Sequence, residues 1–160
     1  MPTIQTLDIT NEYAKFVFEP LERGYGHTVG NALRRVLLSS IPGAAVNAVR
    51  IVKVFHEFAP IPGLKEDTTE FLLNLKDLAI RIDPDAIVEE EIECKIDVKG
   101  PVRVTGADVV CPPGVEIVNP EFYLATISAP DASLQVDLYV GQGVGYTLPE
   151  RQEKYKGIIG

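Results

Sequence analysis

The sequence has little of the chemistry from which most active sites and metal sites are built. Its 160 residues include two histidines, two cysteines and no tryptophan. His27 and His56 belong to no zinc-binding pattern, and neither Cys94 nor Cys111 has a cysteine or histidine close to it in sequence. We therefore expect no catalytic residue, no metal site and no cofactor in this chain.

Leader-like features and long apolar runs are also missing. Residues 1–11 contain neither a basic side chain nor an apolar core, and apolar runs elsewhere fall far short of the ~20 residues of a membrane-spanning helix. Two cysteines are too few for the disulfide framework of a secreted domain. These absences predict a cytoplasmic protein that does not associate with a membrane.

Positive charge is the third shortage. Lysine and arginine total 15 against 23 aspartates and glutamates, which gives a formal net charge of -8. Nucleic-acid affinity is built from cations that neutralise phosphates, so we expect no direct nucleic-acid binding. A basic protein partner remains compatible with this charge.

What is present is the pattern of an α+β protein. Residues 13–18 are rich in aromatic and β-branched side chains and predict a strand. Thr28 is the expected N-cap of a helix at residues 29–39, which Pro42-Gly43 would stop. Residues 65–79 predict a second helix, with acidic residues in its first turn.

From residue 80 onward the sequence predicts mainly antiparallel strands. Apolar and polar residues alternate over residues 92–99 and 134–140, as in strands with one face in water. Shorter strands are expected at residues 102–105 and 123–127. A further strand at residues 50–58 is expected to precede the second helix.

The domain organisation follows from this order of elements. Residues 1–48 are expected to form a small subdomain of one strand and one helix, and residues 49–160 a mostly antiparallel β-rich subdomain with one helix.

The glycine-rich run 141–145 precedes no helix, so it is expected to end a β element rather than to hold a phosphate. Cys94 falls on the apolar side of its strand and is expected to be buried, and the polar tail 149–160 to be loosely held.

On a helical wheel, the first predicted helix has apolar residues on two opposite sides. Leu38 lies between Arg34 and Arg35, a composition typical of protein interfaces because guanidinium groups are weakly hydrated and pair with carboxylates. The alternative is that Leu38 packs under the Pro42-Gly43 turn. The opposite side is expected to be an ordinary buried stripe of Val29, Ala32, Leu33, Val36 and Leu37.

The second predicted helix repeats this arrangement. Leu73 emerges among polar and charged residues that include Glu70 and Lys76. One exposed leucine needs no explanation, but two that are each surrounded by charge favour a protein that binds other proteins. The core stripe of this helix is expected to consist of Phe71, Leu72, Leu75, Leu78 and Ala79.

Residues 19–43, EPLERGYGHTVGNALRRVLLSSIPG, resemble the signature of the bacterial RNA polymerase α subunit in its N-terminal domain. The match is long and contiguous, which makes it more specific than a short catalytic motif. Further similar segments follow in the family's order at residues 56–58, 65–76, 115–120 and 143–146. The resemblance therefore covers most of the chain.

In that family the α subunit catalyses nothing. Two copies dimerise and form the platform on which the β and β′ subunits of DNA-directed RNA polymerase, a nucleotidyltransferase complex, assemble for transcription. The resemblance implies that residues 29–39 are the dimer-interface helix, with the apolar stripe Val29, Ala32, Leu33, Val36 and Leu37 in the contact. The surfaces for the β and β′ subunits would then include Arg34, Arg35, Leu38, Glu70, Leu73 and Lys76.

Family members continue beyond the point that corresponds to Gly160, with further strands, a second dimerisation helix and a DNA-binding domain. Residues 1–48 would thus be the first half of the dimerisation and assembly subdomain, and residues 49–160 the inserted one. We expect the isolated chain to be mostly monomeric or prone to aggregate, because half of the helical pairing surface lies outside it. The alternative is a stand-alone β-rich domain that binds a protein, or a small ligand in a cleft between the two subdomains.

Overall fold

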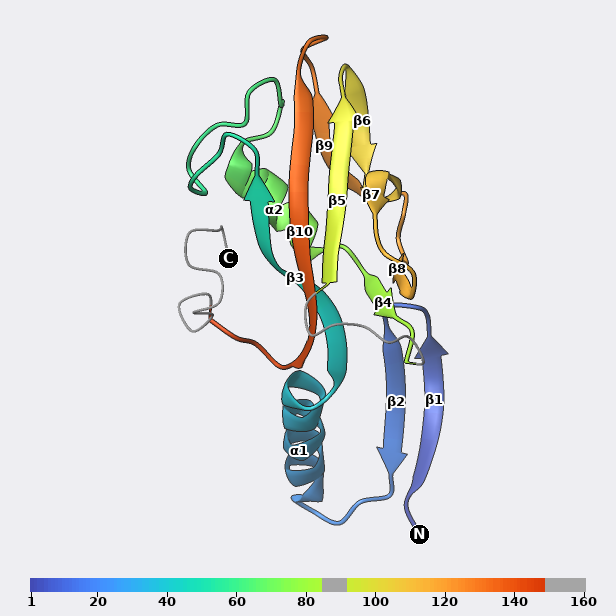
Figure 1. Ribbon diagram of the computed structural model, residues 1–160. Helices are drawn as coiled ribbons and strands as arrows, with labels where there is room; N and C mark the ends of the chain where they lie inside the picture. The colour runs from blue at the N-terminus through green and yellow to red at the C-terminus, as the bar shows by residue number, and fades with distance from the viewer. Residues whose placement is uncertain (85–91, 149–160) are drawn as a thin grey trace. The chain divides into compact units, whose positions relative to one another are not determined.

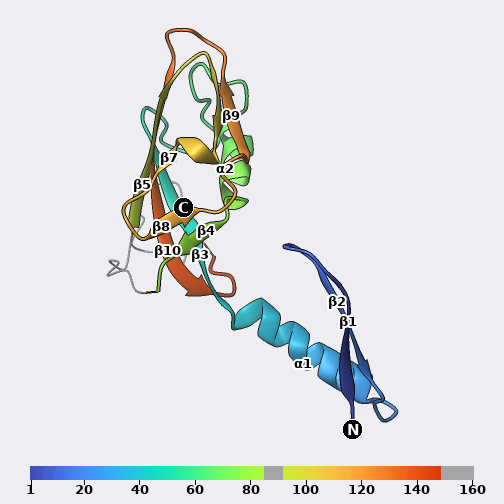
Figure 2. The same cartoon turned by 90° about the vertical axis from the view of Figure 1, so that its right-hand side faces the viewer.

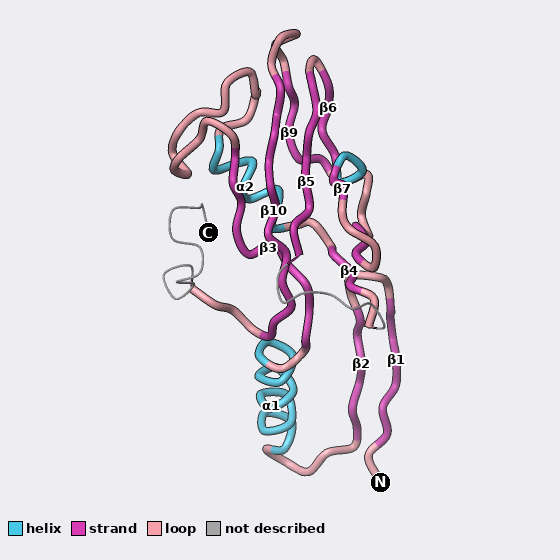
Figure 3. Tube along the Cα trace, viewed as in Figure 1, coloured by secondary structure: helices cyan, strands magenta, loops and turns pink. Residues whose placement is uncertain are grey.

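The computed structural model describes residues 1–84 and 92–148, so the tail predicted to be loosely held lies outside the described residues. The chain divides into two compact units, Met1–Ile41 and Pro42–Gly160. Both units contain strands and a helix, and the strands are paired antiparallel (Figure 3). The chain is therefore α+β, as the sequence predicts. In the part of the chain that is described, no helix has both the length and the apolar character needed to cross a membrane.

The first unit begins with a hairpin of strands β1, Thr3–Ile9, and β2, Ala14–Glu19. The two strands run side by side in both views (Figures 1 and 2), with Ile4 opposite Phe18. β2 confirms the strand predicted at residues 13–18. β1 has no counterpart among the predicted elements, because a register shift between Thr6 and Asp8 interrupts its period of two.

Helix α1, Tyr25–Ser39, begins earlier than predicted. Its N-cap is Gly24, whose φ of 91° lies in the left-handed region that glycine enters without a steric penalty. Thr28 is inside the helix, so its prediction as the N-cap is wrong. Of the two glycines that flank Tyr25, Gly24 lies outside the helix and Gly26 lies inside it.

The apolar stripe of α1 is not buried in this chain. None of the 15 residues of α1 is buried; Val29 is half-buried and the other four residues of the stripe are exposed. The prediction of an ordinary buried stripe is therefore wrong. Helical spacing determines which side chains share a face, but it does not determine whether the same chain supplies a surface to cover that face.

The second unit is built on a six-stranded antiparallel sheet in the order β7-β5-β10-β3-β4-β8. β10, Ser133–Val144, lies between β5, Ile92–Lys99, and β3, Pro42–Ile51 (Figure 1). The outer strands are β7, Val109–Val110, at one edge, and β4, Ile80–Ile82, followed by β8, Val115–Ile117, at the other.

A second layer consists of a two-stranded sheet and two short helices. Strands β6, Val102–Thr105, and β9, Tyr123–Ile127, pair antiparallel and confirm the two shorter strands predicted there. Helix α2, Thr68–Lys76, lies beside β9 (Figure 2), and the 3-10 helix η1, Gly106–Asp108, follows β6. The core between the layers includes Phe71, Leu75, Leu124, Ile127, Leu134 and Leu138.

The predicted alternation along β5 and β10 is confirmed by burial. Ile92, Cys94 and Ile96 are buried, while the residues between them are exposed. β10 shows the same period, and it continues to Val144, so the glycine-rich run does end a β element. Burying such side chains stabilises the unit by roughly 1.5–3 kcal/mol each.

Two predicted elements have different bounds. The strand expected at residues 50–58 is instead β3, because pairing with β10 over its whole length holds the alanine-rich residues before Arg50 in a strand. Lys53, with a φ of 69°, follows the end of this strand. α2 begins at Thr68 because the Asp67 side chain accepts a hydrogen bond from the backbone N–H of Glu70 at 2.7 Å and caps the helix.

Candidate functional site

Helix α1 exposes a continuous set of apolar and basic side chains. Leu38 is 61% exposed. Arg34 and Arg35 are exposed beside it, and no part of the helix is buried. The predicted composition of this surface, one leucine between two guanidinium groups, is therefore present on the folded chain and open to water.

The β1–β2 hairpin carries a second exposed apolar surface, which the sequence analysis missed. Paired residues of antiparallel strands share a face, so Ile4 lies beside Phe18, and Phe16 follows on the same face at a spacing of two. Beyond the register shift, Ile9 pairs with Ala14 and returns to this face. The isoleucine and phenylalanine side chains of this face are all exposed. The opposite face holds mainly polar residues. The signal that could have revealed it is the spacing of two between Phe16 and Phe18 in β2.

Helix α2 presents the other predicted surface. Phe71 and Leu75 are buried, whereas Leu73 is 55% exposed and has exposed Glu70 and Lys76 on the same helix. The predicted core stripe is confirmed for Phe71, Leu75 and Leu78, with Leu72 half-buried, whereas Ala79 is exposed and its place in the stripe is wrong. The outward side chains of α2 are thus held on a helix that is anchored in the core.

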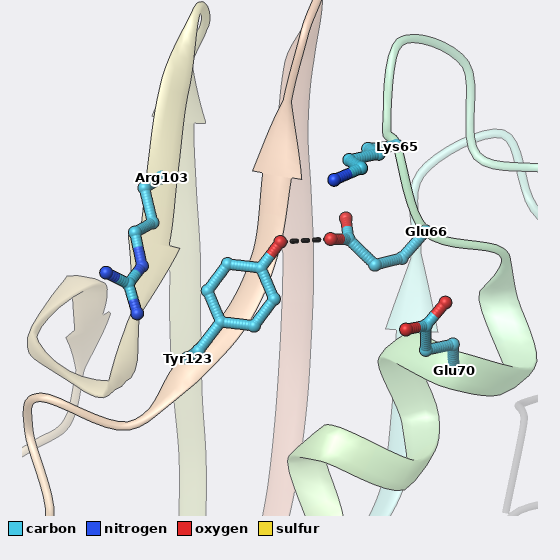
Figure 4. A pocket seen from close by; sticks show the side chains of 5 residues that line it. All are labelled: Lys65, Glu66, Glu70, Arg103 and Tyr123. Carbon is cyan, nitrogen blue, oxygen red and sulfur yellow. Dashed lines mark hydrogen bonds between the residues drawn. The ribbon is translucent and has the colours of Figure 1, made fainter.

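A cavity of about 420 Å³ opens beside α2 in the second unit (Figure 4). Its lining joins residues from three parts of the sequence: Lys65, Glu66, Glu70, Arg103 and Tyr123. Of these, the sequence analysis had singled out only Glu70 as a site residue. The guanidinium of Arg103 lies over the ring of Tyr123, with 5.0 Å between Cζ and the ring centroid.

Glu66 is the buried carboxylate of this cavity. It accepts a hydrogen bond from the Tyr123 hydroxyl and another from the backbone N–H of Thr126 at 2.8 Å. Burial alone would raise the pKa of Glu66, but the hydrogen bonds outweigh burial and hold the pKa below its usual value. For Tyr123, burial and the bond to Glu66 raise the pKa of the phenol. Glu66 therefore stays ionised, and it ties the start of α2 to β9.

This arrangement favours a structural role for the cavity over a catalytic one. Both carboxylate oxygens of Glu66 have donors within the chain, and an ionised carboxylate of lowered pKa is a poor general acid. No group of three or more histidine, cysteine or acidic residues converges on a metal-sized site within residues 1–84 and 92–148. The exposed faces of α1 and α2 remain the strongest candidates for functional surfaces.

The fold places this chain among α+β proteins with a large antiparallel β-rich unit. The family described as the RNA polymerase Rpb3/RpoA insert domain matches residues 49–160, and the chain belongs to this family. The resemblance to the bacterial α subunit that the sequence motifs indicate is thereby confirmed.

Similar proteins carry the name DNA-directed RNA polymerase subunit alpha. One from Desulforudis audaxviator is 47% identical over 161 residues, which cover 99% of this chain and 50% of that protein. One from Carboxydothermus hydrogenoformans is 44% identical over 99% of this chain and 49% of its own length. One from Roseiflexus is 47% identical over 95% of this chain and 46% of its own length. The chain spans about half the length of the curated relatives it matches.

Proposed function

We propose that this chain is the assembly portion of an RNA polymerase α subunit, a cytoplasmic and non-catalytic part of the transcription machinery. In this role it dimerises and provides a platform for the β and β′ subunits. The observation that carries the proposal is α1, a 15-residue amphipathic helix without a single buried residue. The relatives named as α subunits of DNA-directed RNA polymerase support the same assignment.

The dimer contact is assigned to the apolar stripe of α1. Leu33, Val36 and Leu37 are each more than half exposed, with Val29 and Ala32 on the same face. Covering such side chains with a second copy of the helix removes apolar surface from water, which contributes roughly 1.5–3 kcal/mol for each large side chain that becomes fully buried. An exposed apolar surface of this kind marks an interaction site or an aggregation liability.

The large subunits are assigned to the charged surfaces. Arg34, Arg35 and Leu38 on α1 present two forked donors beside an apolar side chain, which suits a partner with carboxylates around an apolar pocket. On α2, Leu73 stands between an acidic and a basic residue, Glu70 and Lys76, so this surface selects a partner of mixed charge. One partner would contact α1 and the other α2.

Co-purification tests the proposal. A tagged chain co-expressed with β and β′ is expected to retain both subunits, whereas a stand-alone ligand-binding domain would retain neither. Arg35→Ala is expected to weaken the capture of β by about 2–5 kcal/mol, because a desolvated carboxylate of the partner loses its counter-charge.

The matched control for that experiment is Arg81→Ala. Arg81 is also an exposed arginine and pairs with Glu116, but it lies on β4 outside the proposed surfaces. The control variant is expected to retain β as well as the unmodified chain does. Equal retention by the Arg35→Ala variant would exclude the assigned α1 surface.

A further inference from the structure

We propose that Cys94 and Cys111 form a redox modification site, a cross-strand dithiol that closes to a disulfide in the presence of a low-molecular-weight disulfide such as oxidised glutathione. The proposal is independent of the assembly function. Both cysteines are free thiols in the structure. The argument rests on the register of two strands, on burial and on the position of one strand at the sheet edge.

The register of β5 and β7 places the two cysteines opposite each other. The strands pair antiparallel, with Ile96 opposite Val109 and Lys95 opposite Val110. Continuing this register by one step, just beyond the end of β7, would set Cys94 against Cys111. Opposed residues of antiparallel strands have Cα atoms about 4.5–5.5 Å apart. A disulfide needs about 4.4–6.8 Å between its Cα atoms, so the register already provides the required spacing.

Both thiols also lie on the inner face of the sheet. Side chains alternate along β7: Val109 is buried, whereas Val110 is 71% exposed. The same alternation turns Cys111 inward, where it is half-buried, and Cys94 is fully buried on the matching face of β5. The register and the shared inner face together place the two thiols close to each other.

The two thiols differ in access and in acidity. β7 is the edge strand of the sheet and is two residues long, so the half-buried Cys111 at its end can be reached from water, whereas the buried Cys94 cannot. The interaction with Cys111 and burial raise the pKa of the Cys94 thiol, which keeps Cys94 protonated. Cys111 is thus the thiol that attacks, and Cys94 the thiol that resolves.

The exchange takes place in two balanced steps. The Cys111 thiolate attacks one sulfur of oxidised glutathione, breaks its S–S bond and releases one glutathione thiolate, leaving a mixed disulfide on Cys111. The Cys94 sulfur then attacks the Cys111 sulfur, and its proton goes to the departing second glutathione. Two protein thiols are oxidised to one disulfide, and one glutathione disulfide is reduced to two thiols. The new bond joins the edge strand β7 covalently to β5.

Intact mass measurement after exposure to oxidised glutathione tests the site. The full chain is expected to become lighter by two hydrogen atoms without gaining a glutathione group, and peptide mapping is expected to find Cys94 joined to Cys111. Its melting temperature should rise on oxidation and return after reduction, because the bond restricts the unfolded chain. A mixed disulfide that persists in the unmodified chain, or no reaction at all, would overturn the proposal.

Two single variants separate the roles of the thiols. Cys94→Ser is expected to accumulate one glutathione group on Cys111, because the resolving thiol is absent. Cys111→Ser is expected to stay unmodified over the same time, because Cys94 is buried. Equal labelling of the two variants would contradict the assigned order of attack. Should either variant fail to fold, mapping of the disulfide in the unmodified chain still decides whether the pair closes.

Discussion

The two units of this chain differ in whether their apolar side chains are buried. Among the described residues of Pro42–Gly160, 20 buried residues form one hydrophobic cluster between the six-stranded sheet and its covering layer. In Met1–Ile41, no residue is buried, although the hairpin and α1 both carry an apolar face. Both units follow the same rules of patterning. The comparison teaches that an amphipathic pattern identifies an apolar face, but does not determine whether the same unit supplies the surface that covers it.

The largest expected difference between the units comes from truncating matched apolar side chains. Phe71→Ala in α2 removes a fully buried ring and is expected to destabilise the second unit by about 3–5 kcal/mol. Leu37→Ala in α1 removes a side chain that is 62% exposed and is expected to change the stability of the isolated chain by less than about 0.5 kcal/mol. Urea denaturation followed by circular dichroism measures both. Equal losses for the two variants would show that α1 is part of a packed core.

Glu66 allows a sharper test of what holds the second unit together. Glu66→Gln keeps the shape but removes the charge that accepts from Tyr123 and Thr126, so a loss of about 1.5–3 kcal/mol is expected near neutral pH. Because the folded-state pKa of Glu66 is lowered, its contribution is present above its ordinary pKa and disappears as the pH falls through the lowered value.

The difference in unfolding free energy between the unmodified chain and Glu66→Gln should therefore shrink toward zero in acid. Glu121→Gln, which alters an exposed carboxylate of the same unit, is the control and should show little difference at any pH. If this difference in unfolding free energy does not change with pH, the ionised state of Glu66 is not what stabilises the fold.

A smaller effect is expected at the N-cap of α2. Asp67→Ala removes the side-chain acceptor of the Glu70 N–H and is expected to reduce stability by about 1 kcal/mol. Thermal unfolding gives the comparison with Asp131→Ala, a change at an exposed aspartate outside any helix. α1 has no side-chain cap, so the two helices differ here as well. If the Asp67→Ala and Asp131→Ala variants have the same melting temperature, the cap makes no measurable contribution to stability.

The parts of the fold that the sequence could predict are those determined by local periodicity. Alternation of apolar and polar residues identified β5 and β10, and helical spacing identified the buried stripe of α2 around Phe71. β3 escaped prediction because its alanine-rich stretch has weak strand propensity and is held by pairing with β10.

The parts that escaped prediction at the candidate sites depend on contacts distant in sequence. Glu66 finds its donors 57 and 60 residues further along the chain, at Tyr123 and Thr126. Nothing near Glu66 in sequence indicates that it is buried. The composition of the α1 surface could be predicted because Arg34, Arg35 and Leu38 are neighbours on one helix. The exposure of this α1 surface could not be predicted, because exposure depends on which other surfaces of the chain pack against it.

The smallest expected effect on folding, with the largest consequence for assembly, comes from Leu38→Asp. Leu38 is exposed and lies opposite the apolar stripe, so the isolated chain should keep the same circular dichroism spectrum and the same unfolding midpoint. Capture of β should be lost, because a carboxylate beside two arginines would neutralise them and would be buried against the partner. Leu75→Asp is the matched change in α2, where the side chain is fully enclosed, and it should unfold the second unit. If the Leu38→Asp chain unfolds as Leu75→Asp does, the Leu38 side of α1 is buried. If it folds and still retains β, Leu38 is not part of the binding surface.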